Sequence, residues 1–193
     1  MKENFEFLHA FLKHPLTVGA IAPSSPELAK MMVRDVEADE NRIVIELGVG
    51  TGAITKFIEK EIPNNKSYLG IEVDKEMVES LHKKFDDLNI VCGSACETHA
   101  IHKDSGLGKP AYILCCLPFV TLPADVGKRV LGEIEKFMEQ GCTFRTFQYA
   151  HGYYTPSAIK LREFMRNRYG KSKRSPLVVK NVPPAYTLTW STG

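Results

Sequence analysis

The sequence lacks the features that mark several classes of protein. Its 193 residues include five cysteines, but no Cys-x-x-Cys pair and no histidine at zinc-finger spacing, so we expect free thiols and no metal site. The N-terminus has neither the basic start nor the apolar core of a signal peptide. The longest uncharged stretch, 110–124, is too short to cross a bilayer and contains three prolines. These absences predict a cytoplasmic chain.

The net charge of +2 gives no general attraction to nucleic acid. The positive charges are nevertheless concentrated, because residues 160–180 hold eight lysines and arginines against Glu163 alone. Beside an anionic bilayer, each well-placed cation contributes about 1 kcal/mol. Residues 2–13 form an amphipathic pattern with Phe5, Leu8 and Leu12 on one stripe. Such a helix would either pack on the domain or lie in a lipid interface.

One stretch carries a strand, a glycine-rich turn and a helix in succession. The apolar run 43–47 predicts a buried strand, and 53–62 predicts a helix. Between them the glycines are spaced G-x-G-x-G, whereas dinucleotide-binding turns have G-x-G-x-x-G. Bare glycine backbone admits a ligand closely, and the start of a helix favours a carboxylate or phosphate. With Glu46 two residues before the first glycine, the turn resembles motif I of the class I S-adenosylmethionine (SAM) methyltransferases.

A second expected strand, 67–71, ends in Glu72, twenty residues after Gly52. A carboxylate at that place accepts hydrogen bonds from both ribose hydroxyls of an adenosine. Because ligands of such sheets bind at the carboxyl ends of the strands, the cofactor should meet several neighbouring turns. The residues expected to bind it there are Glu46, Gly48, Gly50, Thr51, Gly52, Glu72, Val73, Ser94 and Ala95.

Strands and helices alternate along the whole chain. This order predicts one α/β domain over 1–193, with 1–36 as an N-terminal helical extension. The expected architecture is a Rossmann-like sheet, mostly parallel with an antiparallel last strand, and helices on both faces. The expected helices are 26–36, 75–85, 124–140 and 157–169, besides 53–62, with 97–109 a short helix or loop. The further strands are 89–92, 111–115, 143–149, 177–182 and 186–191.

The turn after the expected strand 111–115 reads Cys116-Leu117-Pro118-Phe119. It resembles the N-P-P-Y or N-L-P-Y loop of methyltransferases that modify an amine nitrogen, in which backbone carbonyls and Asn accept the amine's hydrogens. Cys116 stands in the place of that Asn, so one acceptor is absent. This favours a flexible alkylamine over a flat adenine amine. An ordinary strand-to-helix turn is the alternative interpretation of this loop taken alone.

Three segments together resemble the bacterial phospholipid N-methyltransferases. They are Pro-Leu-Thr-Val-Gly-Ala-Ile-Ala-Pro-Ser-Ser at 15–25, Leu-Pro-Phe at 117–119 and Asn-Val-Pro-Pro-Ala at 181–185. The resemblance extends from about Phe7 to Trp190. It implies SAM-dependent methylation of the amine headgroup of a membrane lipid such as phosphatidylethanolamine. It also implies a peripheral protein on the anionic inner face of the cytoplasmic membrane.

The same resemblance suggests roles for individual residues. The carbonyls of Leu117 and Pro118 would orient the amine, while Phe119 and Tyr149 shape its pocket and a tyrosine face attracts a methylated ammonium. The remaining cofactor-binding assignments are Ser24, Ser25, Cys115 and Cys116. A neutral amine would attack the sulfonium methyl directly, without a metal or a covalent enzyme intermediate.

Two other functions stay open at this point. An RNA adenine-N6 (di)methyltransferase shares motif I and a similar loop, but such enzymes usually append a helical RNA-binding domain, and we do not expect nucleic acid as the partner. A non-catalytic membrane-associated protein with a SAM fold is the second alternative. Ser94 keeps it open, since methyltransferases commonly carry an acid there, and so does Cys116.

Overall fold

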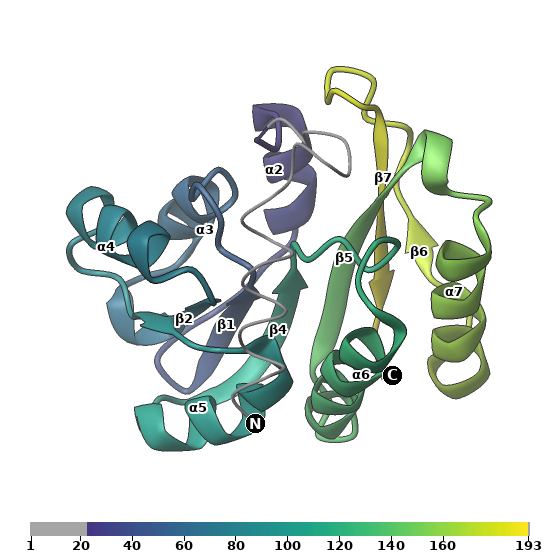
Figure 1. The fold of residues 1–193 in the computed structure, drawn as a ribbon. Coiled ribbons are helices and arrows are strands. Elements are labelled where there is room, and N and C mark those ends of the chain that lie inside the picture. The colour runs from purple at the N-terminus through teal and green to yellow at the C-terminus, as the bar shows by residue number, and fades with distance from the viewer. Residues whose placement is uncertain (1–22, 193) are drawn as a thin grey trace.

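The computed structural model describes residues 23–192, so the expected helix at 2–13 and most of the 15–25 segment lie outside the described residues. The strands are β1 Arg42–Leu47, β2 Tyr68–Glu72, β3 Ile90–Cys92, β4 Lys109–Cys115, β5 Thr143–Tyr149, β6 Lys173–Arg174 and β7 Ala185–Trp190. They form one sheet in the order β3-β2-β1-β4-β5-β7-β6 (Figure 1). Strands β1 to β5 pair in parallel, and β7 pairs antiparallel with both β5 and β6. The predicted Rossmann-like sheet is confirmed.

Helices cover both faces of this sheet, as predicted. They are α2 Pro26–Val33, α3 Thr55–Glu61, α4 Lys75–Lys84, α5 Thr98–Ser105, α6 Ala124–Met138 and α7 Pro156–Tyr169, with short 3-10 turns at Asn65–Ser67, Ala95–Glu97 and Ala150–Gly152. One core lies under α2, α3 and α4 and contains Val44 and Tyr68. The other lies under α5, α6 and α7 and contains Ile45 and Trp190. Successive residues of β1 thus enter opposite cores, which explains its uninterrupted apolar run.

Helix α2 begins where the sequence predicts and ends earlier. The side chain of Ser25 accepts a hydrogen bond from the Leu28 N–H at 3.1 Å, and Pro26 is the first helical residue. The expected end was at residue 36, but the helix stops at Val33, before Asp35 with its φ of 59°. Arg145 of β5 donates to the carbonyls of Met32 and Arg34 at 2.8 and 2.6 Å. A buried guanidinium therefore satisfies the final carbonyl groups that a longer helix would have paired internally.

The expected strand 177–182 is wrong. Only Val178 of this segment pairs with β7, through an isolated bridge to Ala185. The edge strand that pairs with β7 is the short β6 instead. Prolines at 176, 183 and 184 remove backbone donors on both sides of the segment. The side chain of Asn181 also accepts a hydrogen bond from the N–H of Ser25, the N-cap of α2. The segment is therefore a loop with one paired residue.

Two further properties concern the described residues 23–192 as a whole. All five cysteines are free thiols, with Cys115 and Cys142 buried and Cys92 exposed. No helix within this range combines the length and the apolar character needed to cross a membrane.

Candidate active site

Two glycines in the turn after β1, Gly48 and Gly50, are required for different physical reasons. Gly48 has φ of 77°, and a Cβ there would lie 2.6 Å from Cδ2 of Leu117. Gly50 has φ of 58°, but a Cβ there would meet no atom within 4 Å. Close packing thus excludes a side chain at Gly48. At Gly50 the left-handed backbone favours glycine and leaves the peptide bare towards open space.

Glu46 is a fully buried carboxyl group beneath this turn. Its Oε2 accepts hydrogen bonds from the hydroxyls of Tyr68 at 2.6 Å and Thr55 at 2.8 Å, and Cys116 Sγ lies 3.8 Å from Oε1. Burial raises the pKa of Glu46 to about 7, although these hydrogen bonds favour the ionised form. Among the described residues these partners are all neutral, so the ionised carboxylate has no cationic partner there. A cationic ligand group next to Oε1 would stabilise it.

Glu72 supports the glycine turn from the end of β2. Its Oε2 accepts from the N–H of Gly50 at 2.8 Å, and its Oε1 accepts from the N–H groups of Val73 at 2.8 Å and Asp74 at 3.0 Å. The side chain is only 4% exposed. Each carboxylate oxygen retains further acceptor capacity, so contact with a ribose remains a prediction. Through its hydrogen bond to Gly50, the Glu72 carboxylate fixes the position of that peptide.

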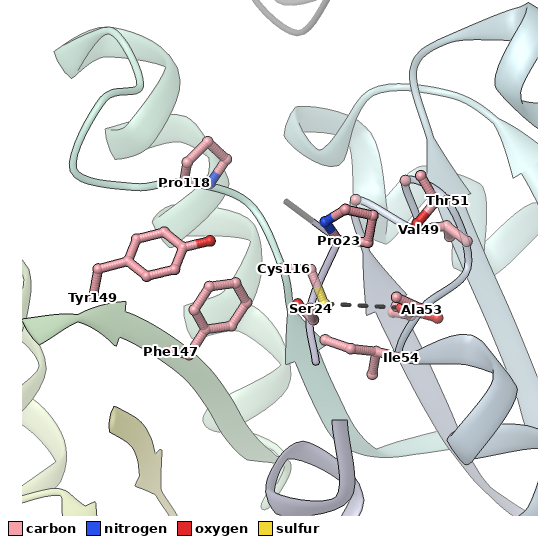
Figure 2. Close-up of a pocket in the computed structure, with 13 residues that line it drawn as sticks. Pro23, Ser24, Val49, Thr51, Ala53, Ile54, Cys116, Pro118, Phe147 and Tyr149 are labelled. Carbon is pink, nitrogen blue, oxygen red and sulfur yellow. Dashed lines mark hydrogen bonds between the residues drawn. The ribbon is translucent and has the colours of Figure 1, made fainter. Parts of the chain in front are cut away.

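A cavity of ≈ 320 Å³ lies between the glycine turn and the side chains of Phe147 and Tyr149, which we call the aromatic wall. In Figure 2, Val49, Thr51 and Ile54 stand on one side and Phe147, Tyr149 and Pro118 on the other, with Cys116 and Ser24 between them. The dashed line runs from the Cys116 thiol to the carboxyl group of Glu46. The lining residues are Pro23, Ser24, Glu46, Gly48, Val49, Gly50, Thr51, Ala53, Ile54, Cys116, Pro118, Phe147 and Tyr149. Four separate parts of the chain thus meet at the carboxyl ends of β1, β4 and β5.

The structure gathers some of the predicted residues and separates others. Those that line the cavity are Ser24, Glu46, Gly48, Gly50, Thr51, Cys116, Pro118 and Tyr149. Those that do not are Ser25, Gly52, Glu72, Val73, Ser94, Ala95, Cys115, Leu117 and Phe119. Ser94 caps the short turn Ala95–Glu97 after β3, while Cys115 and Leu117 are buried in the core. A Cβ at Gly52 would strike Phe85 of the α4 end at 2.5 Å, so this glycine serves packing.

The loop after β4 differs in detail from the predicted arrangement. The Leu117 carbonyl accepts from the Phe119 N–H at 2.9 Å, and the Pro118 carbonyl accepts from the N–H groups of Thr121 and Leu122 at 2.9 and 3.1 Å. The Thr121 hydroxyl is a third donor to Pro118, at 3.1 Å. This tight turn directs Phe119 into a different groove, between α6 and α7. Pro118 therefore contributes its ring to the cavity wall, while its carbonyl is already engaged.

Sequence reasoning missed five lining residues, namely Pro23, Val49, Ala53, Ile54 and Phe147. Phe147 had a usable signal, because it stands two residues before Tyr149 on β5 and therefore on the same face. The two rings meet edge to face with centroids 5.5 Å apart. Burial raises the pKa of Tyr149 to about 12, so its hydroxyl stays protonated at neutral pH.

This fold, with a bare glycine turn between two carboxylates, is that of a class I SAM-dependent methyltransferase. Residues 44–141 match the family model described as a methyltransferase domain, and the chain belongs to that family.

Individual relatives differ in what they modify. An ornithine lipid N-methyltransferase from Singulisphaera acidiphila is 28% identical over 147 residues, which cover 75% of this chain and 77% of the relative. Ribosomal RNA small subunit methyltransferase A from Mycoplasma mycoides is 36% identical, but over 67 residues that cover 35% of this chain and 24% of the relative.

Solved structures support the fold. An rRNA methylase from Streptococcus thermophilus superposes with a TM-score of 0.62 at 12% identity, covering 86% of this chain and 95% of the other. Magnesium protoporphyrin IX methyltransferase from Synechocystis, solved with bound SAM, gives a TM-score of 0.58 at 11% identity, with coverage of 96% and 82%.

The residues present fit SAM as the cofactor. The open space above Gly50 leaves room for the amino-acid end of the cofactor against bare backbone. Glu46 provides a buried carboxylate whose described partners are neutral, which suits an ammonium or sulfonium group. Among residues 23–192, no group of three or more histidine, cysteine or acidic side chains is arranged to hold a metal ion.

Proposed function

We propose that this methyltransferase transfers methyl groups to the amine headgroup of a membrane lipid. The observation that carries the proposal is the aromatic wall of Phe147 and Tyr149, which faces the glycine turn across the cavity (Figure 2). Aromatic side chains at this place suit an alkylammonium product better than an uncharged acceptor. The relative that this chain matches over three quarters of its length is named as an ornithine lipid N-methyltransferase. Ornithine lipid and phosphatidylethanolamine are therefore the two substrates to compare.

Each part of the cavity has a distinct role in this proposal. Bound SAM supplies a methyl group on a sulfonium, which an amine lone pair can attack. Glu46 and the peptide at Gly50 hold the amino-acid end of the cofactor, and Glu72 holds the ribose. Pro118 and Phe147 confine the acceptor, so that much of the rate acceleration comes from alignment, on the order of 7–11 kcal/mol where it is ideal.

Tyr149 has two functions at the acceptor nitrogen. Its hydroxyl points into the cavity (Figure 2) and is able to accept one hydrogen bond from the amine. This replaces the Pro118 carbonyl, whose acceptor sites are taken by Thr121 and Leu122. As the positive charge passes from sulfur to nitrogen, the faces of the aromatic wall stabilise it.

RNA adenine methylation is the second candidate, favoured by the short match to a ribosomal RNA methyltransferase. The Cys116 thiol argues against it. This thiol lies against Glu46, and its pKa is raised well above the ordinary value by burial. It is a weak, protonated donor where a flat adenine amine needs a strong acceptor.

A single assay distinguishes these functions. The purified full chain is incubated with methyl-labelled SAM and vesicles of phosphatidylcholine that contain phosphatidylethanolamine, ornithine lipid or neither, and separately with ribosomal RNA. We expect label in one or both amine lipids and none in phosphatidylcholine alone or RNA. Label in RNA alone would establish the second candidate. Binding of S-adenosylhomocysteine without any transfer would favour a non-catalytic protein.

A further inference from the structure

Exposed large hydrophobic side chains are concentrated at one corner of the molecule. Among the described residues 23–192 there are four, namely Tyr154, Leu177, Val179 and Val182, with exposures of 78%, 37%, 67% and 72%. We call these four the apolar corner. Three of them lie in the loop between β6 and β7, which projects at the upper edge of Figure 1 beside α2. This is the edge at which β4 and β5 end.

The local backbone explains why these side chains point outwards. Val178 is buried and its N–H donates to the Ala185 carbonyl at 2.8 Å, while its neighbours Leu177 and Val179 on either side of this single bridge are exposed. Tyr154 is connected to the same region through Tyr153, whose ring lies 5.3 Å from that of Tyr154 and 5.2 Å from that of Tyr186 in β7. Two chain segments therefore contribute to the apolar corner, the loop before β7 and the residues before α7.

Two cations lie beside the apolar corner, namely Arg174 and Lys180. After Glu163 the sequence has no acidic residue up to its last position, while it has Arg166, Arg168, Lys171, Lys173, Arg174 and Lys180. Arg174 lies over the ring of Tyr186 at 4.7 Å, within the aromatic group that leads to Tyr154. Lys180 lies between the two exposed valines and pairs with Glu27 at 3.6 Å, yet its side chain is 75% exposed. The surface therefore combines apolar side chains with cations.

The same loop is bonded to the neighbours of two residues that line the cavity. Asn181 Oδ1 accepts from the N–H of Ser25 at 2.8 Å, next to the lining residue Ser24. The Pro184 carbonyl accepts from the N–H of Ala150 at 2.7 Å, next to the lining residue Tyr149. Whatever binds the apolar corner is therefore held close to the cavity.

We propose that the apolar corner docks on an anionic bilayer, with Val179 and Val182 entering the interface and with Arg174 and Lys180 facing lipid phosphates. The inference rests on the proposed lipid function and specifies the surface through which the membrane is met. A bilayer accepts both components of this surface, since apolar side chains partition into the acyl boundary and cations bind anionic headgroups. RNA would engage the cations and leave the exposed valines without a favourable contact.

A tryptophan reporter tests the contact directly. The chain has one tryptophan, Trp190, which is 2% exposed, so Val179→Trp in the full chain introduces a distinct exposed fluorophore. We expect its emission to shift to shorter wavelength on adding vesicles of phosphatidylcholine with phosphatidylglycerol, and the shift to shrink with salt. Lys103→Trp on α5, at the opposite end of the molecule (Figure 1), should show no shift. No shift at Val179→Trp, or equal shifts at both positions, would overturn the inference.

Vesicle co-sedimentation provides the second measurement. Val179→Ser/Val182→Ser should lower the partition coefficient about tenfold, and Arg174→Ser/Lys180→Ser should weaken binding at low salt. Lys83→Ser/Lys103→Ser, which removes the same charge elsewhere, should bind like the wild type. Unchanged vesicle binding by Val179→Ser/Val182→Ser contradicts the docking surface. Wild-type protein that binds RNA but does not co-sediment with vesicles contradicts it as well.

The docking surface and the lipid function can fail separately. If binding depends on Val179 and Val182 but no label enters any lipid, the proposed function fails and the surface stands. If lipid in detergent micelles is methylated while the valine variant binds vesicles normally, the function stands and the surface fails.

Discussion

Asn181 accepts a hydrogen bond from the backbone N–H of Ser25 at 2.8 Å, although 156 residues separate them. Its amide nitrogen donates to the Pro183 carbonyl at 2.7 Å, and the side chain is 2% exposed. The described end of the segment 15–25, residues 23–25, thus meets the segment 181–185 in space; these two segments carry the most specific resemblance to phospholipid N-methyltransferases. One of them supplies Pro23 and Ser24 to the cavity, and the other fixes their position.

Asn181→Ala should weaken cofactor binding without touching the cofactor site. It leaves the Ser25 N–H without its partner, and we expect a loss of about 1–3 kcal/mol in the free energy of unfolding. The affinity for S-adenosylhomocysteine, measured by calorimetry, should fall as Pro23 and Ser24 lose their support. Asn167→Ala, at an exposed position of α7, is the control and should change neither quantity. An unaltered affinity in Asn181→Ala would show that this contact is structural only.

Gly50→Ala should separate backbone strain from ligand exclusion. A Cβ at Gly50 meets no protein atom, so the strain of its positive φ costs about 1 kcal/mol of stability. Gly106→Ala is a matched control, since Gly106 has φ of 66° and equally open surroundings away from the cavity. Both variants should lose similar stability, but only Gly50→Ala should lose affinity for S-adenosylhomocysteine. Equal affinities in the two variants would mean that the cofactor does not lie against Gly50.

Glu72→Ala should lower the affinity for S-adenosylhomocysteine by about 100-fold. The variant removes the proposed ribose acceptors and also releases the Gly50 N–H, which is 2.8 Å from Oε2. Glu59→Ala, at an exposed position of α3, is the control and should bind normally. Calorimetry in which both variants match the wild type would remove Glu72 from the site.

Stability should fall with rising pH because of Glu46. Burial raises its pKa from 4.5 to about 7, so the folded state keeps a proton that the unfolded state has released. The resulting loss in the free energy of unfolding is absent below about pH 4.5 and grows between that pH and about pH 7. It then reaches about 3 kcal/mol. Glu46→Gln removes the ionisation, so its melting temperature should rise relative to the wild type across this interval. A constant difference between the two proteins at every pH would contradict the raised pKa.

The ionisation of Glu46 should affect ligand affinity in the opposite sense, so that affinity increases as pH rises. The ammonium group at the amino-acid end of the ligand favours the ionised form of Glu46, so affinity for S-adenosylhomocysteine should weaken as pH falls below about 7. In Glu46→Gln the affinity should be lower and nearly independent of pH in that range. Calorimetry as a function of pH measures both effects.

Tyr149 should be needed chiefly for its ring. Tyr149→Phe removes one hydrogen-bond acceptor and should lower kcat/KM for the lipid amine severalfold. Tyr149→Ala also removes the ring face, whose attraction for a desolvated ammonium is about 2 kcal/mol, and should lower it more than tenfold further. S-adenosylhomocysteine affinity should change little in Tyr149→Phe. Equal activity of the Phe and Ala variants would exclude the cation–π role.

The elements that the sequence predicted well are those whose signal is local. The buried strand before Gly48, the glycine turn and the cap at Ser25 depend on neighbouring residues, and the structure has them in place. The predicted strand 177–182 failed because distant contacts decide that segment. A run of Leu-Val-Val has a strand's composition, but Asn181 bonds to Ser25 and Pro184 bonds to Ala150.

The candidate site likewise contains some residues that local sequence signals predict and others that distant contacts decide. Spacing and the motif I resemblance pointed to Glu46, Gly48 and Gly50, which line the cavity, because a strand and a turn present their residues in a fixed order. The ribose role of Glu72 stays a prediction. The direction of Phe119 and the binding of α2 carbonyls by Arg145 came only from the tertiary structure. The physical reason is that the fold class follows from short-range periodicity, whereas a cavity is formed by side chains from strands and loops that only packing brings together.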